Sequence, residues 1–429
     1  MKTYINPKKA EWQQLIERPS IKTADMNELV SSIFQTIEKL RDAAVRGYTK
    51  RFDQVEVRNP QVSVSEIERA CEDVPQELKN AIDLAARNIE AFHSAQFEER
   101  SVIETQKGVR CWRENRPIEK VGLYIPGGTA PLFSTVLMLG IPAKLAGCKE
   151  IILCTPPSKD GTINPAILFA AQRVGITKIY KVGGVQAIAA LAQGTETIPK
   201  VDKIFGPGNQ YVTAAKSFAL TKGVAIDMPA GPSEVLIIAD QTSNPAFVAA
   251  DLLSQAEHGA DSQVLLLSTR EEIIRQVQTE IDLQLERLPR KEIAQKALEN
   301  SSFVQLDTLE ACFELSNAYA PEHLILAFDS ASEYLPQISN AGSVFIGKYS
   351  CESAGDYASG TNHTLPTNGY ARNYSGVSLD SFLKKITFQE LNAEGIQTIG
   401  SAIEIMAEAE QLIAHKNAVS LRLNALKNG

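Results

Sequence analysis

Histidine and cysteine are scarce in this sequence, and it contains neither a long apolar run nor a block of basic residues. Five of the 429 residues are histidine and six are cysteine. The cysteines are scattered and form no CxxC pair, which favours free thiols in a reducing compartment. No stretch reaches the ~18–20 apolar residues that a membrane helix requires, and the first residues lack the apolar core of a signal peptide. We therefore expect a soluble cytoplasmic protein.

The charge balance excludes another class of partner. The chain carries 43 basic and 51 acidic residues, a formal charge of −8, and has no cluster of Lys and Arg that could hold a phosphate backbone. Nucleic-acid binding is therefore not expected. Hydrophobic residues make up 44% and charged residues 22%, a composition typical of globular proteins. A chain of this length is expected to form two to four domains.

The pattern of apolar residues changes along the chain. Residues 26–52 and 78–92 have the period of helices, whereas from residue 121 short β-branched segments end in Gly or Pro and are followed by helical segments. These segments are residues 121–125, 150–154, 178–182, 203–205, 234–239 and 263–267. Such alternation predicts parallel sheets with right-handed crossovers, and the number of strands favours two Rossmann-like sheets. The helical period returns in residues 399–413 and 417–426, so we expect an α/β protein with helical N-terminal and C-terminal extensions.

Three of the predicted strands end in glycine-rich turns. These turns contain Gly127 and Gly128, Gly183 and Gly184, and Gly206 and Gly208. Glycine lets a ligand approach the backbone, and the N-terminus of the following helix favours a pyrophosphate. None of the turns has the G-x-G-x-x-G pattern, and glycine after a strand often serves the turn alone. A dinucleotide site and simple turn chemistry are about equally favoured at this point.

Four of the five histidines lie in polar clusters. Each has a carboxylate or amide near it in the sequence: Gln255 with His258, Glu322 with His323, Asp356 with His363, and Glu410 with His415. Imidazole and carboxylate suit Zn²⁺, and a neutral imidazole can also take a proton near pH 7. Each histidine alone could equally be a hydrogen-bonded surface residue, and His93 is expected to be structural. An oxidoreductase, a zinc hydrolase and a non-catalytic protein all remain open on these residues.

Seven segments, in order from about residue 22 to the C-terminus, together resemble histidinol dehydrogenase. They are Ile125-Pro-Gly-Gly, Phe205-Gly-Pro-Gly-Asn, Ile226-Asp-Met-Pro-Ala-Gly-Pro-Ser-Glu, Gln255-Ala-Glu-His-Gly, Pro321-Glu-His-Leu, Gly355-Asp-Tyr-Ala-Ser-Gly-Thr-Asn-His and His415-Lys-Asn-Ala-Val. The resemblance implies oxidation of L-histidinol through L-histidinaldehyde to L-histidine, the last steps of histidine biosynthesis, with two NAD⁺ and one Zn²⁺ per site. It also implies a homodimer.

The resemblance assigns a role to each matching position. It implies Glu322 and His323 as the acid–base pair. The implied Zn²⁺ ligands, which would also contact the substrate together with that pair, are Gln255, His258, Asp356 and His415. Further substrate contacts would be Ser233, His363 and Glu410, and the NAD⁺ site would be lined by Tyr124, Gln186 and Asn209. Glu410 and His415 are expected to act in the neighbouring subunit's site.

The resemblance and the strand pattern together suggest four parts of the chain. Residues 1–21 would be an N-terminal extension, residues 22–123 with 233–376 a discontinuous α/β domain, residues 124–232 a second α/β domain, and residues 377–429 a helical dimerisation segment. Two other functions remain as alternatives. One is a zinc hydrolase in which Glu322 activates metal-bound water, and the other is a relative that keeps the fold and metal site but has lost catalysis.

Overall fold

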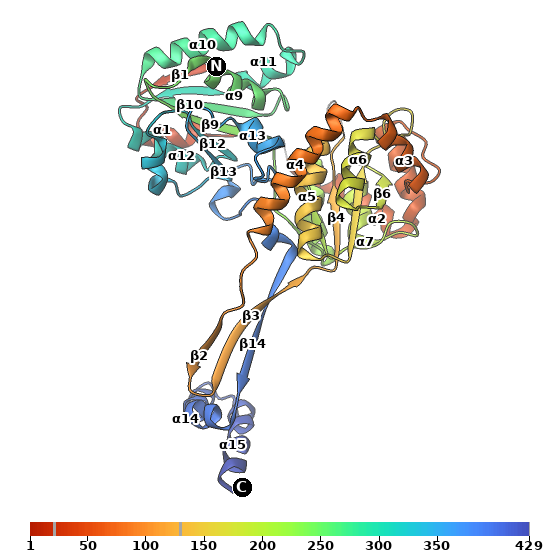
Figure 1. Ribbon diagram of the computed structural model, residues 1–429, viewed down its shortest axis with the longest axis vertical. Coiled ribbons are helices and arrows are strands. Elements are labelled where there is room, and N and C mark those ends of the chain that lie inside the picture. The colour runs from red at the N-terminus through yellow and green to blue at the C-terminus, as the bar shows by residue number, and fades with distance from the viewer. Residues whose placement is uncertain (20–22, 128–130, 429) are drawn as a thin grey trace. The chain divides into compact units, whose positions relative to one another are not determined.

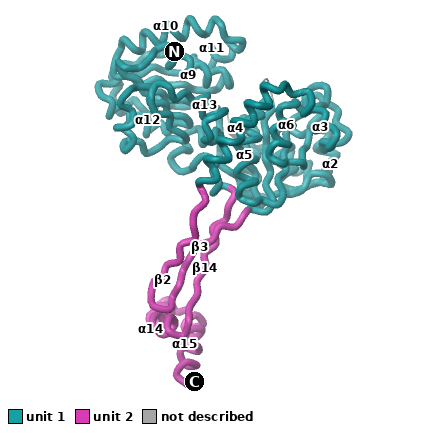
Figure 2. Tube along the Cα trace, in the orientation of Figure 1, with its two compact units in different colours: residues 1–95, 118–381 teal, residues 96–117, 382–429 magenta. Residues whose placement is uncertain are grey.

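Strands β9 (Glu234–Ala239) and β10 (Gln263–Ser268) are largely apolar because helices cover both faces of their sheet. The structure is a computed structural model that describes residues 1–19, 23–127 and 131–428. Two compact units are distinguished in Figure 2, one of residues 1–95 and 118–381 and one of residues 96–117 and 382–429. The first unit contains both parallel sheets (Figure 1). The predicted α/β fold with two Rossmann-like parallel sheets is therefore confirmed.

The first sheet has six strands, and each neighbouring pair is parallel. Their order is β1 (Lys2–Ile5), β11 (Ser302–Gln305), β10, β9, β12 (His323–Leu326) and β13 (Ser343–Ile346). Alternate residues of β9 enter two different cores. Val235 and Ile237 pack with α9 (Pro245–Ala256), α10 (Glu271–Leu285) and α11 (Lys291–Glu299). Leu236 and Ile238 pack with α1 (Lys9–Leu15) and α12 (Leu309–Tyr319), which completes three layers.

The second sheet has five parallel strands. Their order is β6 (Lys178–Lys181), β5 (Glu150–Thr155), β4 (Lys120–Tyr124), β7 (Lys203–Phe205) and β8 (Ala225–Ile226). The helices that follow these strands are α5 (Phe133–Ala146), α6 (Pro165–Val174), α7 (Gly184–Gln193) and α8 (Gln210–Ala219). The chain leaves β4 toward β5 on one side and returns beside it as β7 on the other. This change of direction forms the crevice in which α/β sheets bind ligands.

The N-terminal part of the chain is divided between the two sheets. Strand β1 pairs with β11 of the six-stranded sheet, and the buried Trp12 and Leu15 of α1 pack in the core on one face of that sheet. Helices α2 (Thr23–Tyr48), α3 (Val64–Asp73) and α4 (Gln76–Ser94) pack against the helices of the five-stranded sheet. The domain division suggested from the sequence places these three helices in one domain with residues 233–376 instead. Helical periodicity shows that a helix has an apolar face, but not which sheet that face will cover.

The second unit contains an antiparallel sheet and two helices. Strands β2 (Val102–Gln106) and β14 (Leu383–Leu391) flank β3 (Val109–Pro117), and α14 (Ala393–Ala409) packs against α15 (Ile413–Asn428). The sequence correctly placed two helices near the C-terminus but missed β14. This strand has few apolar residues, and all its side chains are half-buried or exposed. The alternation of apolar and polar residues that would indicate a strand is therefore weak.

Two further sequence expectations concern membrane segments and undescribed residues. None of the helices in the described ranges has both the length and the apolar character needed to cross a bilayer. The suggested boundary at residues 21 and 22 lies outside the described residues, as does part of the first glycine turn, residues 128–130.

Candidate active site

The candidate acid–base residues lie at the amino end of β12 in the six-stranded sheet, beside the amino end of β9. Glu322 immediately precedes β12, His323 is its first residue, and His323 is in register with Val235 of β9. Both residues are buried, at 7% exposure for Glu322 and 3% for His323. Pro321 precedes the pair and restricts the backbone before the strand begins. The two groups therefore have fixed positions in a dry environment.

Two neighbours hold the imidazole of His323. Its Nδ1 lies 2.9 Å from Gln255 Nε2 and 3.1 Å from the Glu234 carbonyl oxygen, whereas its buried Nε2 has no hydrogen-bond partner in the described structure. The carbonyl oxygen can only accept and the Gln255 NH2 can only donate, so the two contacts require opposite tautomers of His323. In the tautomer with the proton on Nδ1, that proton is donated to the Glu234 carbonyl, the Gln255 Nε2 contact is not a hydrogen bond, and Nε2 has a free lone pair. Burial lowers the pKa of His323, so the imidazole is neutral near pH 7. A neutral imidazole with an open nitrogen is suited to accept a proton.

The carboxyl group of Glu322 is fixed by backbone. Its Oε2 accepts a hydrogen bond of 2.9 Å from the Glu234 amide and lies 3.6 Å from His323 Nδ1. Burial raises the pKa of Glu322 well above that of an ordinary carboxyl, and the negative charges of Glu234 and Asp356 raise it further. A raised pKa favours the protonated carboxyl, which can donate a proton as well as accept one after it ionises.

A cluster of metal-ligand atoms lies beside the acid–base pair. His258, Glu352 and Asp356 each offer a ligand atom within 4.8 Å of the other two, and Asp356 Oδ1 is 3.8 Å from His323 Nε2. Gln255 Oε1 and Glu352 Oε2 are buried and have no hydrogen-bond partner in the described structure. Buried polar atoms without partners are uncommon. Glu352 is itself part of the cluster, and Gln255 contacts His323, whose Nε2 lies 3.8 Å from Asp356 Oδ1. The cluster fits a bound Zn²⁺.

Three of the four predicted Zn²⁺ ligands contribute to this region, and the sequence analysis missed one neighbour. Gln255 lies in the last turn of α9, His258 follows that helix, and Asp356 lies in α13 (Glu352–Tyr357). The missed residue is Glu352, which is four positions before Asp356 and therefore lies on the same face of α13. That spacing was the available signal. Burial raises the pKa of Glu352 well above its usual range, with the charge of Asp356 contributing next.

The predicted substrate residues differ in where they lie. His363 joins the site through its Nδ1, 3.0 Å from the Asp356 carbonyl oxygen, and its Nε2 is 3.0 Å from Thr135 Oγ1, a neighbour that the sequence analysis missed. Ser233 directly precedes β9. Glu410 and His415 belong to the second unit, where both side chains are exposed, so their roles stay predictions.

His93, the one histidine left without a role in the site, is fully buried in α4. Its Nε2 lies 3.4 Å from Asn362 Nδ2. This environment agrees with the structural role expected for it.

The predicted dinucleotide residues line one cavity at the carboxyl end of the five-stranded sheet. The cavity has a volume of about 800 Å³ and is lined by Tyr124, Gln186 and Asn209, together with Asp53. The Tyr124 hydroxyl accepts a 3.1 Å hydrogen bond from the Gly184 amide, and Gln186 Nε2 donates to Asp53 Oδ2 at 3.3 Å. Burial raises the pKa of Tyr124 to about 12 and that of Asp53 to about 6.

A buried ion pair supports the glycine turn that ends in Asn209. Lys216 Nζ lies 2.5 Å from Asp227 Oδ1 and donates to the Gly206 carbonyl at 2.9 Å, while Asp227 Oδ2 accepts from the Gly206 amide at 2.8 Å. Gly206 has a φ of +129°, and a Cβ there would lie 2.0 Å from the Tyr124 carbonyl oxygen. Asn209 then caps α8 by accepting from the Tyr211 and Val212 amides at 3.1 Å. The turn thus needs glycine and a buried lysine, and the sequence analysis missed the lysine.

Comparison with known proteins places this arrangement in a family. The family model for histidinol dehydrogenase matches residues 16–423. The histidinol dehydrogenase of Bacteroides thetaiotaomicron is 58% identical over 427 residues, covering 100% of both chains, and that of Mannheimia succiniciproducens is 52% identical over 420 residues, covering 97% of each. The crystal structure of histidinol dehydrogenase from Elizabethkingia anophelis is 62% identical, covers 100% of this chain and 99% of its own, and superposes with a TM-score of 0.98. With similarity over the whole length in both sequence and fold, the chain belongs to the histidinol dehydrogenase family of oxidoreductases.

Proposed function

We propose that the protein oxidises L-histidinol to L-histidine through L-histidinaldehyde, with one Zn²⁺ and two NAD⁺ per reaction. The observation that carries this proposal is the position of His323, a buried neutral imidazole whose open Nε2 faces the donor cluster of His258 and Asp356. The names of the relatives support the choice of substrate, and they support a place at the end of histidine biosynthesis.

The cluster of metal-ligand atoms from His258, Glu352 and Asp356 would hold the metal and, through the metal, the substrate. Gln255, His258 and Asp356 would bind Zn²⁺ together with His415, and Glu352 would lie next to them. When bound, Zn²⁺ would supply a Lewis-acidic anchor for the imidazole and amine of L-histidinol. His363 and Ser233 would restrict the position of the substrate, so that its carbinol carbon stays near His323.

Proton transfer in both oxidations is assigned to His323, which must release the first proton to solvent before it accepts the second. NAD⁺ supplies the hydride acceptor, and the cavity lined by Tyr124, Gln186 and Asn209 is where it would bind. In the first oxidation His323 takes the hydroxyl proton while the carbinol carbon loses a hydride, which gives the aldehyde and one NADH. Glu322 then helps water to add to the aldehyde and form a gem-diol. His323 takes a proton from that diol as a second hydride leaves, which gives the acid and a second NADH.

We further propose that the protein is a homodimer in which Glu410 and His415 complete the partner's site. Large apolar side chains are exposed on α14 and α15 of the second unit, among them Ile405 at 65% and Leu421 at 61%. Exposed apolar side chains of this size are typical of surfaces that another chain covers. The position of Glu410 and His415 in this same unit supports a role for them in trans.

Product formation with and without NAD⁺ tests the proposed activity. The purified protein is incubated with L-histidinol, and L-histidine is measured by chromatography. We expect L-histidine only when NAD⁺ is present, and a chelator should abolish its formation. Turnover that needs metal but not NAD⁺ would favour the zinc hydrolase instead, and binding of L-histidinol without turnover would favour the non-catalytic relative.

A further inference from the structure

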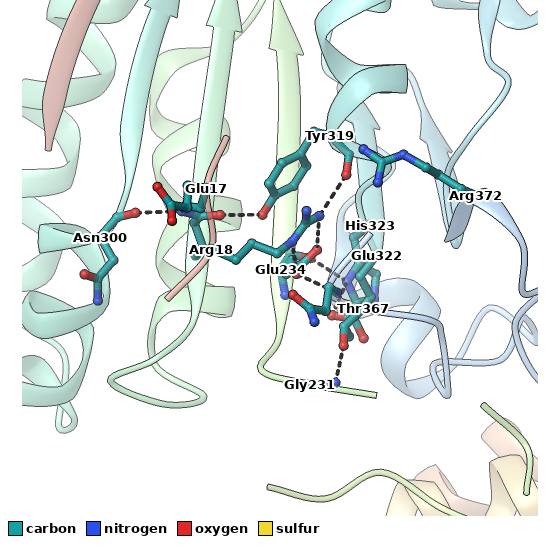
Figure 3. Close-up of polar contacts among 12 residues, drawn as sticks. Glu17, Arg18, Gly231, Glu234, Asn300, Tyr319, Glu322, His323, Thr367 and Arg372 are labelled. Atoms are coloured by element: carbon teal, nitrogen blue, oxygen red, sulfur yellow. Dashed lines mark hydrogen bonds and ion pairs between the residues drawn. The ribbon is translucent and has the colours of Figure 1, made fainter. Parts of the chain in front are cut away.

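Arg18, in the N-terminal segment, forms a buried ion pair with Glu234, the first residue of β9. Arg18 Nε lies 2.5 Å from Glu234 Oε1, and its Nη2 donates to Glu234 Oε2 at 2.9 Å and to the Tyr319 carbonyl at 2.8 Å. The guanidinium carbon is also 3.8 Å from the centre of the Tyr319 ring. Figure 3 shows Arg18 extending to Glu234, with Glu322 and His323 grouped beside Glu234. A bidentate contact between a guanidinium and a carboxylate fixes the relative orientation of the two groups as well as their distance.

Arg18 compensates the negative charge of the Glu234 carboxylate. The Glu234 side chain is 3% exposed, and its other side-chain contact is the Asn368 amide, which donates to Oε1 at 2.7 Å. Removing one partner from a buried ion pair leaves an uncompensated charge, which is relieved by protonation of the carboxylate, by movement of the chain or by entry of water. The position of Glu234 is therefore sensitive to Arg18.

The backbone of Glu234 in turn holds both members of the acid–base pair. Its amide donates to Glu322 Oε2 at 2.9 Å, and its carbonyl oxygen lies 3.1 Å from His323 Nδ1. The carbonyl contact leaves His323 Nε2 free to accept a proton, and the amide contact aims the Glu322 carboxyl. One residue thus orients both groups, and its side chain is fixed by Arg18.

We propose that Arg18 is a positioning residue for the oxidation, because it fixes Glu234 and through it the orientation of Glu322 and His323. The proposal rests on the proposed function for its catalytic meaning. It assigns to the N-terminal segment a part in the reaction, even though Arg18 contacts neither the donor cluster nor the dinucleotide cavity. Misplacement of a reacting group by ~1 Å is enough to cost ~10²-fold in rate.

Kinetics of Arg18→Ala and Arg18→Lys test the proposal. Arg18→Ala should lower kcat for L-histidinol by ~10–100-fold, while KM changes by less than ~3-fold and zinc content stays stoichiometric. Arg18→Lys should fall between Arg18→Ala and the wild type, because lysine keeps the charge but not the two-pronged contact. The matched control is Arg173→Ala, which removes another arginine ion pair of this unit, 2.5 Å from Asp83, and should leave kcat unchanged.

Two readouts separate positioning from a general loss of folded protein. L-histidinol deuterated at the carbinol carbon should give a larger isotope effect on kcat in Arg18→Ala than in the wild type, because hydride transfer becomes slower. A smaller folded fraction would lower kcat without changing the isotope effect. Guanidinium at tens of millimolar should restore part of the lost kcat by occupying the place of the Arg18 head group, and sodium chloride at the same concentration should not.

Hydrogen exchange at the Glu234 amide provides a test that does not need turnover. We expect faster exchange at this amide in Arg18→Ala and no change in Arg173→Ala. Wild-type kcat in Arg18→Ala, an unchanged isotope effect, or unchanged exchange at Glu234 would each overturn the positioning role. If Arg18→Ala does not fold, the same comparisons in Arg18→Lys decide the question. An inactive wild-type enzyme would instead contradict the proposed function, and the exchange comparison would still decide whether Arg18 fixes Glu234.

Discussion

At the scale of single residues, the proposed reaction depends on keeping the proton acceptor and the metal ligands separate. His323 lies beside the donor cluster but keeps an open Nε2 for the proton, whereas His258 contributes its imidazole to the cluster itself. The two histidines are thus chemically alike and differ in surroundings. Replacing each should therefore affect a different property of the enzyme.

The first prediction compares His323→Ala with His258→Ala. Removing His323 should lower NADH formation by ~10²–10⁴-fold, the usual cost of losing a positioned base, while zinc content stays stoichiometric. Removing His258 should lower zinc content, measured by atomic emission. Thr135→Val is the control for metal content, because Thr135 contacts His363 and not the cluster. Near-normal turnover without His323, or full zinc without His258, would contradict these assignments.

The second prediction concerns Asp53, whose pKa is raised to about 6 by burial. The folded protein therefore binds this proton more tightly than the unfolded chain, and its stability falls as the pH rises from about 4 to about 6. Asp53→Asn removes the ionisable carboxyl and with it this loss of stability. The amide oxygen of the asparagine can still accept the hydrogen bond from Gln186. The variant should be more stable than the wild type above pH 6, with the difference shrinking toward pH 4. The gain should be well below the ~3 kcal/mol of the full shift, because Asp53 is only partly buried and water screens its charge. Urea unfolding at several pH values measures it, and equal stability at pH 8 would contradict the assignment.

Sequence alone was informative about these residues only where a local pattern existed. Gln255 and His258 at helical spacing, and Glu322 and His323 after a proline, were recognisable as polar clusters. Thr135 and Arg18 gave no signal, because their partners His363 and Glu234 are distant in the chain and meet them only after folding. The identification of ligands and cofactor residues came from the resemblance, not from spacing.

At the scale of secondary-structure elements, several short apolar strands were predicted closely, although the fully buried β12 was missed. β7 and β9 match the predicted ranges at both ends, because a short apolar run between turn residues has few other interpretations. β1 and β14 were missed because they contain polar residues and owe their conformation to pairing with β11 and β3. Pairing partners far apart in the chain are not visible in local sequence.

The turn between β7 and α8 gives a prediction at this scale. Lys216→Met would leave the carboxylate of Asp227 buried and unpaired, which costs ~3–5 kcal/mol of unfolding free energy. Lys222→Met removes the partly exposed pair with Glu38 and should cost less than ~1 kcal/mol. Urea unfolding of both variants makes the comparison. If Lys216→Met were as mild as its control, the ion pair would not support the turn.

At the scale of the whole molecule, the proposed site needs residues from both units. The cluster of His258 and Asp356 lies in the first unit, whereas Glu410 and His415 lie in the second. A dimer in which each second unit serves the partner's site makes a prediction about mixed subunits.

Mixing two inactive variants tests that exchange of residues. His323→Ala damages the first unit and His415→Ala the second, so a mixed dimer has one intact site if His415 acts in trans. After unfolding and refolding together in equal amounts, the mixture should recover about a quarter of the wild-type activity, since half of the dimers are mixed and each has one working site. No recovery, with dimers shown by light scattering, would mean that His415 acts within its own chain.

The number of NADH molecules formed per L-histidinol tests the central claim most directly. A limiting, known amount of L-histidinol is exhausted by the enzyme with excess NAD⁺, and total NADH is read from its absorbance. Two oxidations at one site, with His323 as base in both, predict two NADH for each L-histidinol and an equal amount of L-histidine. One NADH per L-histidinol would contradict the account, because the reaction would then stop at the aldehyde.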